Sequence, residues 1–202
     1  ALVWEGEDGA VRRLSYVALA GEVNRLASGL QCLGLRAGDA VGLYLPMAPE
    51  VAIAYLGLAR LGCVILPLFS GFGAAAIAAR LNDAQAVALI TADRCLRRGR
   101  DIDMKAIADE AARDVPSLRH VIVAHRAAPA APMQQGRALA WSDVLARGSD
   151  PFPPVDVPAD HPLMIAYTSG TTGRPTGPVP THHGLTVTTG GAFLPFSTPE
   201  RT

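Results

Sequence analysis

Apolar residues near the start of the chain recur at the spacing of an amphipathic helix. They stand alternately four and three positions apart, at Leu19, Val23, Leu26, Leu30 and Leu33. This spacing places all of them on one helical face, and Ser15 before it and Gly34 after it are typical helix ends. The pattern therefore predicts an early helix that packs one face against a core.

Short apolar runs then alternate with further helical segments. The pattern predicts strands at 40–45, 63–68, 86–91 and 120–124, and helices at 49–61, 74–82 and 104–112. The continuously apolar run at 63–68 is typical of a strand that is buried on both faces. Strands and helices that alternate through short links predict an α/β fold around a largely parallel sheet.

Two segments interrupt this alternation. Residues 125–137 are rich in Ala, Pro and Gln and predict a surface loop, whereas prolines crowd residues 149–162. Proline lacks a backbone N–H and fixes φ, so this density predicts a stiff, extended connector. We therefore expect an α/β subdomain at 1–148, a proline-rich connector at 149–162 and a last unit at 163–202 that opens with a strand at 163–167.

Composition and charge exclude several classes of partner. Hydrophobic residues make up 50% of the chain, and 18 basic residues balance 18 acidic ones. With no basic excess, nothing indicates nucleic acid or an anionic membrane surface as a partner. The apolar stretch 51–69 contains Arg60, Gly62 and Pro67. These residues favour a helix, a turn and a buried strand over a membrane span.

The cysteines indicate a reducing compartment. Cys32, Cys63 and Cys95 are odd in number and widely spaced, so we expect small buried hydrophobes and a cytoplasmic location rather than disulfides. The histidines show no ligand spacing, so no metal site built from protein ligands is expected. The chain lacks an initiator methionine and a secretory signal, which leads us to expect a piece of a longer protein.

The segment after the predicted strand at 163–167 carries the strongest chemical signal. It reads Tyr167-Thr168-Ser169-Gly170-Thr171-Thr172-Gly173-Arg174-Pro175-Thr176-Gly177. Glycines let backbone N–H groups approach an anion, hydroxyls add donors, and Arg174 adds a fixed positive charge. The spacing is not that of a P-loop, because the second glycine would fall on Pro175 or Pro178. The composition predicts a polyphosphate-binding loop, with a polar surface turn as the alternative.

This segment resembles the phosphate-loop signature of AMP-forming acyl-CoA synthetases, members of the adenylate-forming superfamily. Thr181-His182 is similar to the Thr-His that follows in that family, and the runs 34–46, 58–64 and 71–93 also agree with it. The last run resembles the acetyl-CoA and short- to medium-chain acyl-CoA branch. The resemblance implies that the chain is an incomplete, opening part of the family's large N-terminal domain.

The resemblance also implies an activity and its ligands. The parent protein would be a ligase that uses ATP, Mg²⁺ and coenzyme A to activate a small carboxylic acid. The implied ATP phosphate-binding residues are Thr168, Ser169, Gly170, Thr171, Thr172, Gly173, Arg174, Thr176 and Gly177. His182 is implied to lie beside the site, and capping of the next helix is an equal alternative for it. No catalytic or metal-binding residue is assigned, because the family's remaining motifs would lie beyond Thr202.

Some positions depart from the family pattern. The family usually has a basic residue where Thr176 stands and an apolar residue where Pro178 stands. Pro178 and Pro180 would each remove a ladder donor from a short strand, so a decayed, non-catalytic remnant stays an alternative. A chain that ends soon after a normally buried strand would leave a sheet edge open, and self-association through that edge is expected.

A second glycine pattern indicates a different class of site. Gly71, Gly73 and Ala76 fit G-x-G-x-x-A between a predicted strand and a helix, and Asp93 follows about 20 residues later. This alternative is an NAD(P)-binding loop, although a glycine turn before a packed helix is favoured. The charged patch of Arg94, Arg97, Arg98 and Arg100, followed by Asp101 and Asp103, is interpreted as a solvated loop.

Overall fold

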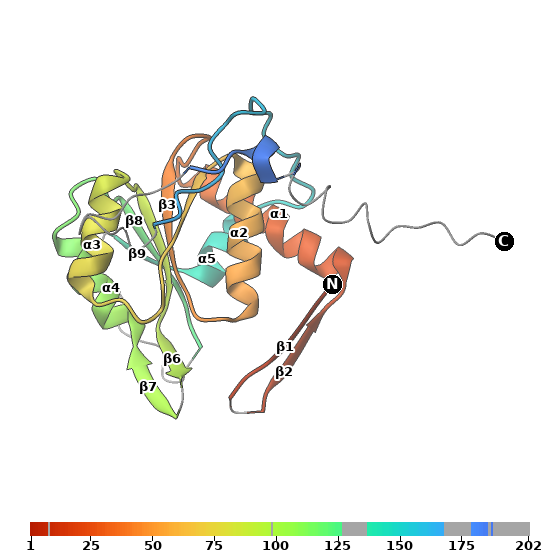
Figure 1. The fold of residues 1–202 in the computed structure, drawn as a ribbon. Helices are drawn as coiled ribbons and strands as arrows, with labels where there is room; N and C mark the ends of the chain where they lie inside the picture. The colour runs from red at the N-terminus through yellow and green to blue at the C-terminus, as the bar shows by residue number, and fades with distance from the viewer. Residues whose placement is uncertain (8, 98, 127–136, 168–178, 186, 188–202) are drawn as a thin grey trace.

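A parallel sheet forms the centre of the molecule (Figure 1). The structure, a computed structural model, describes residues 1–7, 9–97, 99–126, 137–167, 179–185 and 187. The strands lie in the order β4 (Val64–Pro67), β3 (Ala40–Tyr44), β5 (Ala88–Ala92), β8 (His120–Ala124) and β9 (Ala138–Ala140). Every neighbouring pair is parallel. The predicted α/β class with a largely parallel sheet is confirmed.

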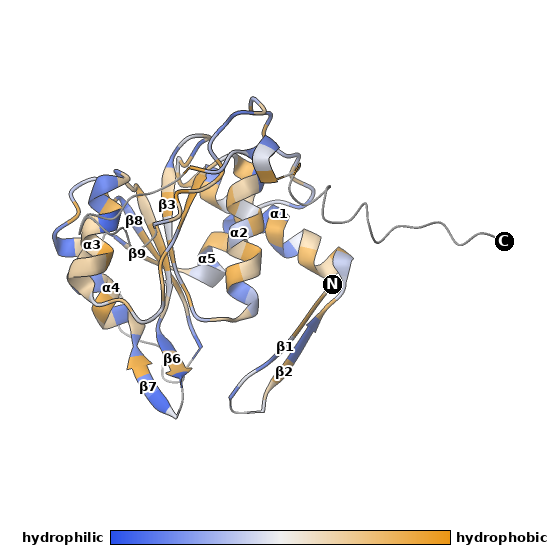
Figure 2. Cartoon of the chain, in the orientation of Figure 1, coloured by the Kyte–Doolittle hydropathy of each residue, from blue (hydrophilic) through white to orange (hydrophobic). Residues whose placement is uncertain are grey.

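Helices cover both faces of this sheet. Figure 1 shows α1 (Tyr16–Cys32), α2 (Pro49–Leu61) and α5 (Trp141–Arg147) on one face. The other face carries α3 (Ala74–Asp83) and α4 (Met104–Arg113). Every residue of β3 and β5 is buried, and the strands of the central sheet are mostly hydrophobic in Figure 2. The hydrophobic core therefore fills the space on both sides of the sheet.

The helix ends follow the chemistry that the sequence indicated. Ser15 Oγ accepts a hydrogen bond from the Ala18 N–H at 3.1 Å, which satisfies one of the open donors of α1. Pro49 occupies the first turn of α2, and Gly62 ends that helix with a φ of +74°. A left-handed φ is accessible to glycine at little steric cost. The predicted helices and strands up to residue 124 are confirmed, with ends that shift by no more than a few residues.

Two hairpins and one edge unit were not predicted. The hairpins are β1 (Leu2–Glu5) with β2 (Val11–Leu14), and β6 (Arg94–Arg97) with β7 (Arg100–Asp103). The edge unit is β9 with α5. Interpreting the arginine patch as a solvated loop was wrong, because Arg94 pairs with Asp103 and also forms an ion pair with Asp101. Its charged residues hid the strand pattern, in which Cys95 is the buried position.

The proline-rich stretch 149–162 forms neither helix nor strand. It contacts α1 through Asn24–Asp150 and Ser28–Ser149 and then the last turn of α2. Arg60 Nε donates to the Phe152 carbonyl at 2.7 Å, and the Val155 N–H donates to the Arg60 carbonyl at 2.9 Å. Cys63 and Cys95 are buried, but Cys32 is exposed, so the expectation that all three are buried was wrong. Within the described ranges, no helix has both the length and the apolarity needed to cross a membrane.

Candidate functional site

The predicted phosphate-binding residues, Thr168 to Arg174 together with Thr176 and Gly177, lie outside the described residues. The structure does describe the chain on both sides of them, to Tyr167 and from Val179 onward. The positions of these two flanks therefore fix where the segment starts and where it ends.

The first flank runs beside β4 in the parallel direction. Met164 pairs with Ile65, the Ile65 N–H donates to the Leu163 carbonyl and the Ile165 N–H donates to the Ile65 carbonyl, both at 2.9 Å. The predicted strand at 163–167 is thus reduced to a single bridge. The next donor on β4 would be Pro67, which has no N–H, so the ladder cannot continue. At Met164 the flank therefore runs in the same direction as β4.

The second flank returns to the first. Thr181 pairs with Pro162 in the antiparallel direction, and the Leu163 N–H donates to the Pro180 carbonyl at 2.9 Å. Pro180 thus takes part in the pairing as an acceptor, which needs no N–H of its own. Residues 162–163 and 180–181, which stand on either side of the predicted phosphate-binding residues, therefore lie side by side.

His182 lies in a short helical turn directly after this bridge. Thr181 Oγ1 accepts from the Gly184 N–H at 3.1 Å, so Thr181, and not His182, caps the turn. The His182 N–H donates to the His161 carbonyl at 3.2 Å, and the two imidazole centroids are 5.8 Å apart. Burial, with a smaller effect from His161, holds the pKa of His182 below its usual value. A neutral imidazole is therefore favoured at this flank.

Tyr167, the last described residue before the motif, is fixed from the side of α3. Its hydroxyl donates to Asp83 Oδ2, and the guanidinium of Arg80 lies 5.6 Å from the centroid of its ring. The same guanidinium lies 4.3 Å from the ring centroid of Phe72. Burial and the Asp83 carboxylate both raise the pKa of Tyr167. The phenol therefore stays protonated and keeps its role as a donor.

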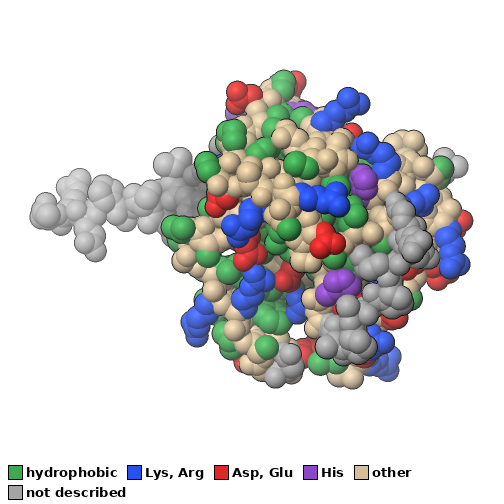
Figure 3. Space-filling view, turned by 180° about the vertical axis from the view of Figure 1, so that it is seen from behind, with side chains coloured by type: hydrophobic (Ala, Val, Ile, Leu, Met, Phe, Trp, Pro, Cys, Tyr) green, Lys and Arg blue, Asp and Glu red, His purple; other side chains and the backbone are tan. Residues whose placement is uncertain are grey.

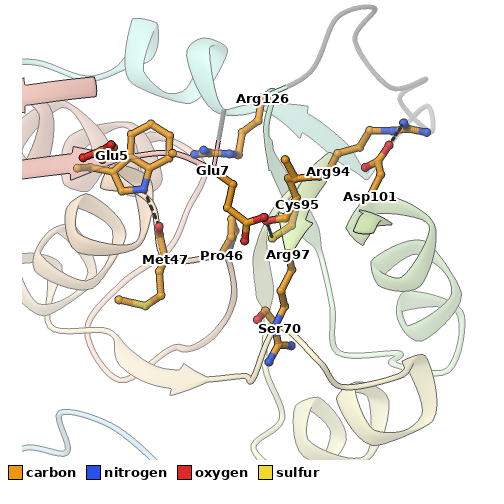
Figure 4. Close-up of a pocket in the computed structure, with 13 residues that line it drawn as sticks. Glu5, Glu7, Pro46, Met47, Ser70, Arg94, Cys95, Arg97, Asp101 and Arg126 are labelled. Atoms are coloured by element: carbon orange, nitrogen blue, oxygen red, sulfur yellow. Dashed lines mark hydrogen bonds and ion pairs between the residues drawn. The ribbon is translucent and has the colours of Figure 1, made fainter. Parts of the chain in front are cut away.

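A pocket of about 490 Å³ opens at the carboxyl ends of the parallel strands (Figure 4). Its wall includes Pro46 after β3, Ser70 after β4 and Arg126 after β8, with residues of both hairpins around them. β3 and β5 are neighbours in the sheet, but the chain leaves β3 toward β4 and leaves β5 toward β8. Open α/β sheets bind ligands at such a switch point. Sequence reasoning missed this pocket, although its walls follow the predicted strand ends.

The charged side chains of the pocket are largely engaged with partners. Arg94 forms an ion pair with Asp101. Arg126 Nη1 forms an ion pair with Glu50 Oε2 at 2.9 Å, and the Arg126 guanidinium lies 4.9 Å from the centroid of the Trp4 ring. Arg97 lies over the ring of Phe69 at 4.8 Å. On the face of the molecule in Figure 3, basic and acidic side chains are likewise interspersed. Neither positive nor negative charge dominates this face, which agrees with the zero net charge of the chain.

The structure contradicts the alternative NAD(P) site at Gly71, Gly73, Ala76 and Asp93. In that site the strands before the glycines and before the acid must be neighbours, but β3 separates β4 from β5. Asp93 is only 1% exposed, and its Oδ1 accepts from the Arg94 and Arg126 N–H groups at 2.7 and 2.8 Å. Its carboxylate therefore ties the end of β5 to the end of β8 and is not available to a ribose.

Metal ligands are not gathered in the part of the chain that the structure describes. No group of three or more His, Cys, Asp or Glu side chains there could hold a metal ion.

Comparison with known proteins gives consistent results. The family model for AMP-binding enzymes matches residues 1–199. The chain is 47% identical to the acetyl-coenzyme A synthetase of Deinococcus radiodurans over 199 residues, which cover 98% of this chain and 30% of that protein. It is 46% identical to the corresponding synthetase of Mycobacterium tuberculosis over 187 residues, 91% of this chain and 29% of that protein.

A solved structure agrees with these sequence matches. Acetoacetyl-CoA synthetase from Streptomyces lividans is 33% identical to the chain, with a TM-score of 0.84 over 92% of this chain and 28% of that one. The chain thus spans about three tenths of the length of the relatives that it matches.

Proposed function

The chain belongs to the AMP-binding enzyme family, and from this premise we propose that it forms the phosphate-binding part of an AMP-forming acyl-CoA synthetase of the acetyl-CoA branch. In the whole enzyme, a carboxylate oxygen would attack the α-phosphorus of ATP and displace pyrophosphate. The thiol of coenzyme A would then attack the acyl carbonyl, releasing AMP and a thioester. The observation that carries this proposal is the 47% identity to an acetyl-coenzyme A synthetase over 98% of the chain.

Within this reaction, the segment from Thr168 to Gly177 would bind the β- and γ-phosphates. Negative charge builds up on the departing pyrophosphate, and fixed N–H and O–H donors stabilise it without reorganising. Arg174 would add a forked positive charge. The two flanks support this role, because the Leu163–Pro180 hydrogen bond joins them and the Tyr167–Asp83 contact attaches the first flank to α3.

The remaining ligands are a carboxylic acid, ATP with its Mg²⁺, and coenzyme A. The described residues offer no cluster for Mg²⁺, so we assign it no ligand among them. His182 is retained as a residue beside the site. We also retain the division into 1–148, 149–162 and 163–202, and a cytoplasmic location, which the three free thiols support.

We expect the chain to bind ATP but not to catalyse adenylation alone. Orientation of two reactants supplies about 7–11 kcal/mol of a barrier, and binding phosphate alone does not lower the chemical step. The test is ATP–pyrophosphate exchange with acetate, propionate, butyrate and octanoate. The 202-residue chain and a protein extended to the length of its relatives would be compared.

Exchange by the extended protein alone is the expected result. Exchange by the short chain at enzymatic rates would contradict its inactivity. A well-folded extended protein that exchanges with none of the acids would favour the alternative of a decayed remnant and would point to Thr176, Pro178 and Pro180.

A further inference from the structure

Cationic and aromatic side chains form a continuous stack from the pocket to Tyr167. The guanidinium of Arg97, which lines the pocket, lies 4.8 Å from the ring centroid of Phe69. The rings of Phe69 and Phe72 meet edge to face at 5.6 Å. Arg80 then lies between Phe72 at 4.3 Å and Tyr167 at 5.6 Å. Each of these contacts falls within the range where cation–π or aromatic pairs attract each other.

The middle of the stack is attached to rigid parts of the fold. The hydroxyl of the fully buried Tyr44 of β3 lies 3.4 Å from the Ser70 carbonyl and 3.3 Å from the Phe72 carbonyl, and its single proton is shared between these two acceptors. Arg80 Nη1 donates to the Ala76 carbonyl at 2.8 Å, whereas its Nε is buried and has no hydrogen-bond partner among the described residues. The two ring faces are therefore principal contacts of the guanidinium, and attraction of this kind strengthens when water is excluded.

We propose that this stack positions Tyr167, the residue directly before the motif, and thereby sets the affinity of the motif for the phosphates of ATP. The inference rests on the proposed function, because it assumes that the motif binds phosphate. Phe72 and Arg80 are positioning residues in this scheme and do not touch ATP. The Asp83 carboxylate acts with them, since it accepts the hydrogen bond of the Tyr167 hydroxyl.

The test compares two substitutions of Phe72 in the 202-residue chain. Phe72→Leu removes the aromatic link, and Phe72→Tyr keeps it. ATP with Mg²⁺ is titrated into each variant, and both the Kd and the amide shifts of residues 168–177 are recorded. We expect Phe72→Leu to weaken binding about threefold to tenfold and to displace the amide signals of the motif, with Phe72→Tyr within about twofold of wild type.

A matched control separates positioning from stability. Phe152 is a buried phenylalanine outside the stack, so Phe152→Leu should lower the melting temperature without changing the Kd of the folded protein. If Phe72→Leu does not fold, Arg80→Gln is measured in its place, because it also breaks the link between Phe72 and Tyr167. The ATP affinity of that variant then tests whether the stack positions Tyr167. Wild-type affinity in Phe72→Leu, or in Arg80→Gln when that variant decides, would overturn the inference. A wild-type chain that binds no ATP would overturn the proposed function and the inference together.

The far end of the stack gives a second, sharper measurement. Arg97→Gln should weaken ATP binding about twofold in the wild-type background and should have no effect in Phe72→Leu, because the connection is already broken there. An equal effect in both backgrounds would mean that Arg97 acts on ATP directly, and would contradict transmission through the stack.

Discussion

Two glycine-bearing segments of the chain differ in the residues that accompany their glycines. The first follows β4 and contains Gly71 and Gly73; the second follows Tyr167 and lies outside the described residues. A Cβ on Gly71 would lie 2.6 Å from the Phe69 ring and 2.9 Å from Arg97 Nη1. The space beside Gly71 is therefore taken by the protein's own side chains, whereas the space beside Gly73 is open. The second segment carries Thr and Ser hydroxyls and Arg174, the donors that an anion needs.

This difference shows that glycine spacing permits a nucleotide site but does not create one. Glycine is needed where the backbone approaches another group closely, and that group can be a ligand or a neighbouring ring. At Gly71 it is Phe69. The acid expected to complete the first site, Asp93, is buried and engaged with backbone donors. The residues beside the glycines and the order of the strands decide which of the two segments is predicted to bind a nucleotide.

The largest expected effect tests the structural role of Asp93. Asp93→Ala should lower the free energy of unfolding by about 2–5 kcal/mol, because two backbone N–H groups lose their buried acceptor. His125 also loses its partner, since its Nδ1 lies 3.4 Å from Asp93 Oδ2. Urea unfolding followed by circular dichroism measures this change. The exposed Asp156 is the control, and Asp156→Ala should leave stability within about 0.5 kcal/mol.

The opposite result would restore the dinucleotide alternative. If Asp93→Ala unfolds like wild type but abolishes binding of NAD(P), the carboxylate serves a ligand and the first segment is a site. We expect instead that NAD(P) leaves the amide signals near Gly71 and Asp93 unmoved, whereas ATP moves those of residues 168–177.

A smaller effect tests the predicted phosphate-binding segment, residues 168–177. Arg174→Ala should weaken ATP binding by about 1.5–3 kcal/mol, because a charge-assisted contact to phosphate is lost. Isothermal titration with ATP and Mg²⁺ measures it. Arg13 is exposed on β2, away from both segments in the sequence, so Arg13→Ala is the matched control for the loss of one positive charge. Equal weakening by both substitutions would indicate a diffuse charge effect and would count against a phosphate contact at Arg174.

The alternation of strands and helices was predictable because its signals are local. The spacing of Leu26 and Leu30, the cap at Ser15 and the end of α2 at Gly62 all lie within one element. Apolar periodicity and end residues therefore sufficed for the helices and for β3, β4, β5 and β8. The order of the strands was not predictable in this way, because it depends on which segments pair across the sheet.

The unpredicted elements depend on contacts with distant residues. β6 alternates charged side chains with the buried Cys95, and its hairpin forms through pairing of Arg94 with Asp103. Residues 163–167 looked like a strand, but the missing N–H of Pro67 limits them to one bridge. The stack through Phe72 and Arg80 reaches Tyr167 only in the fold, because Tyr167 lies far from both of them along the chain.

The smallest expected effect is a pH dependence of amide protection. It should appear next to the phosphate-binding segment and be absent from the segment that contains Gly71 and Gly73. Burial holds the pKa of His182 below its usual value of 6.5. His182 therefore binds a proton more readily when its segment is detached from residues 161–163 than when the two are paired. The free energy of this pairing is fully present above pH 6.5 and decreases as the pH falls below that value. Protection of the Leu163 amide, which donates to Pro180, should fall on acidification from about pH 7.5 to about pH 5.5 relative to the Phe72 amide, which donates to Phe69.

A second histidine makes a control necessary for this measurement. His120, whose pKa burial also lowers, acts from β8 on the whole fold and should affect both amides. His182→Gln should therefore abolish the difference between the Leu163 and Phe72 amides and leave their shared pH dependence. Hydrogen exchange followed by NMR measures both amides. A Leu163 amide that keeps its protection relative to Phe72 in the wild-type chain would show that His182 does not hold this flank.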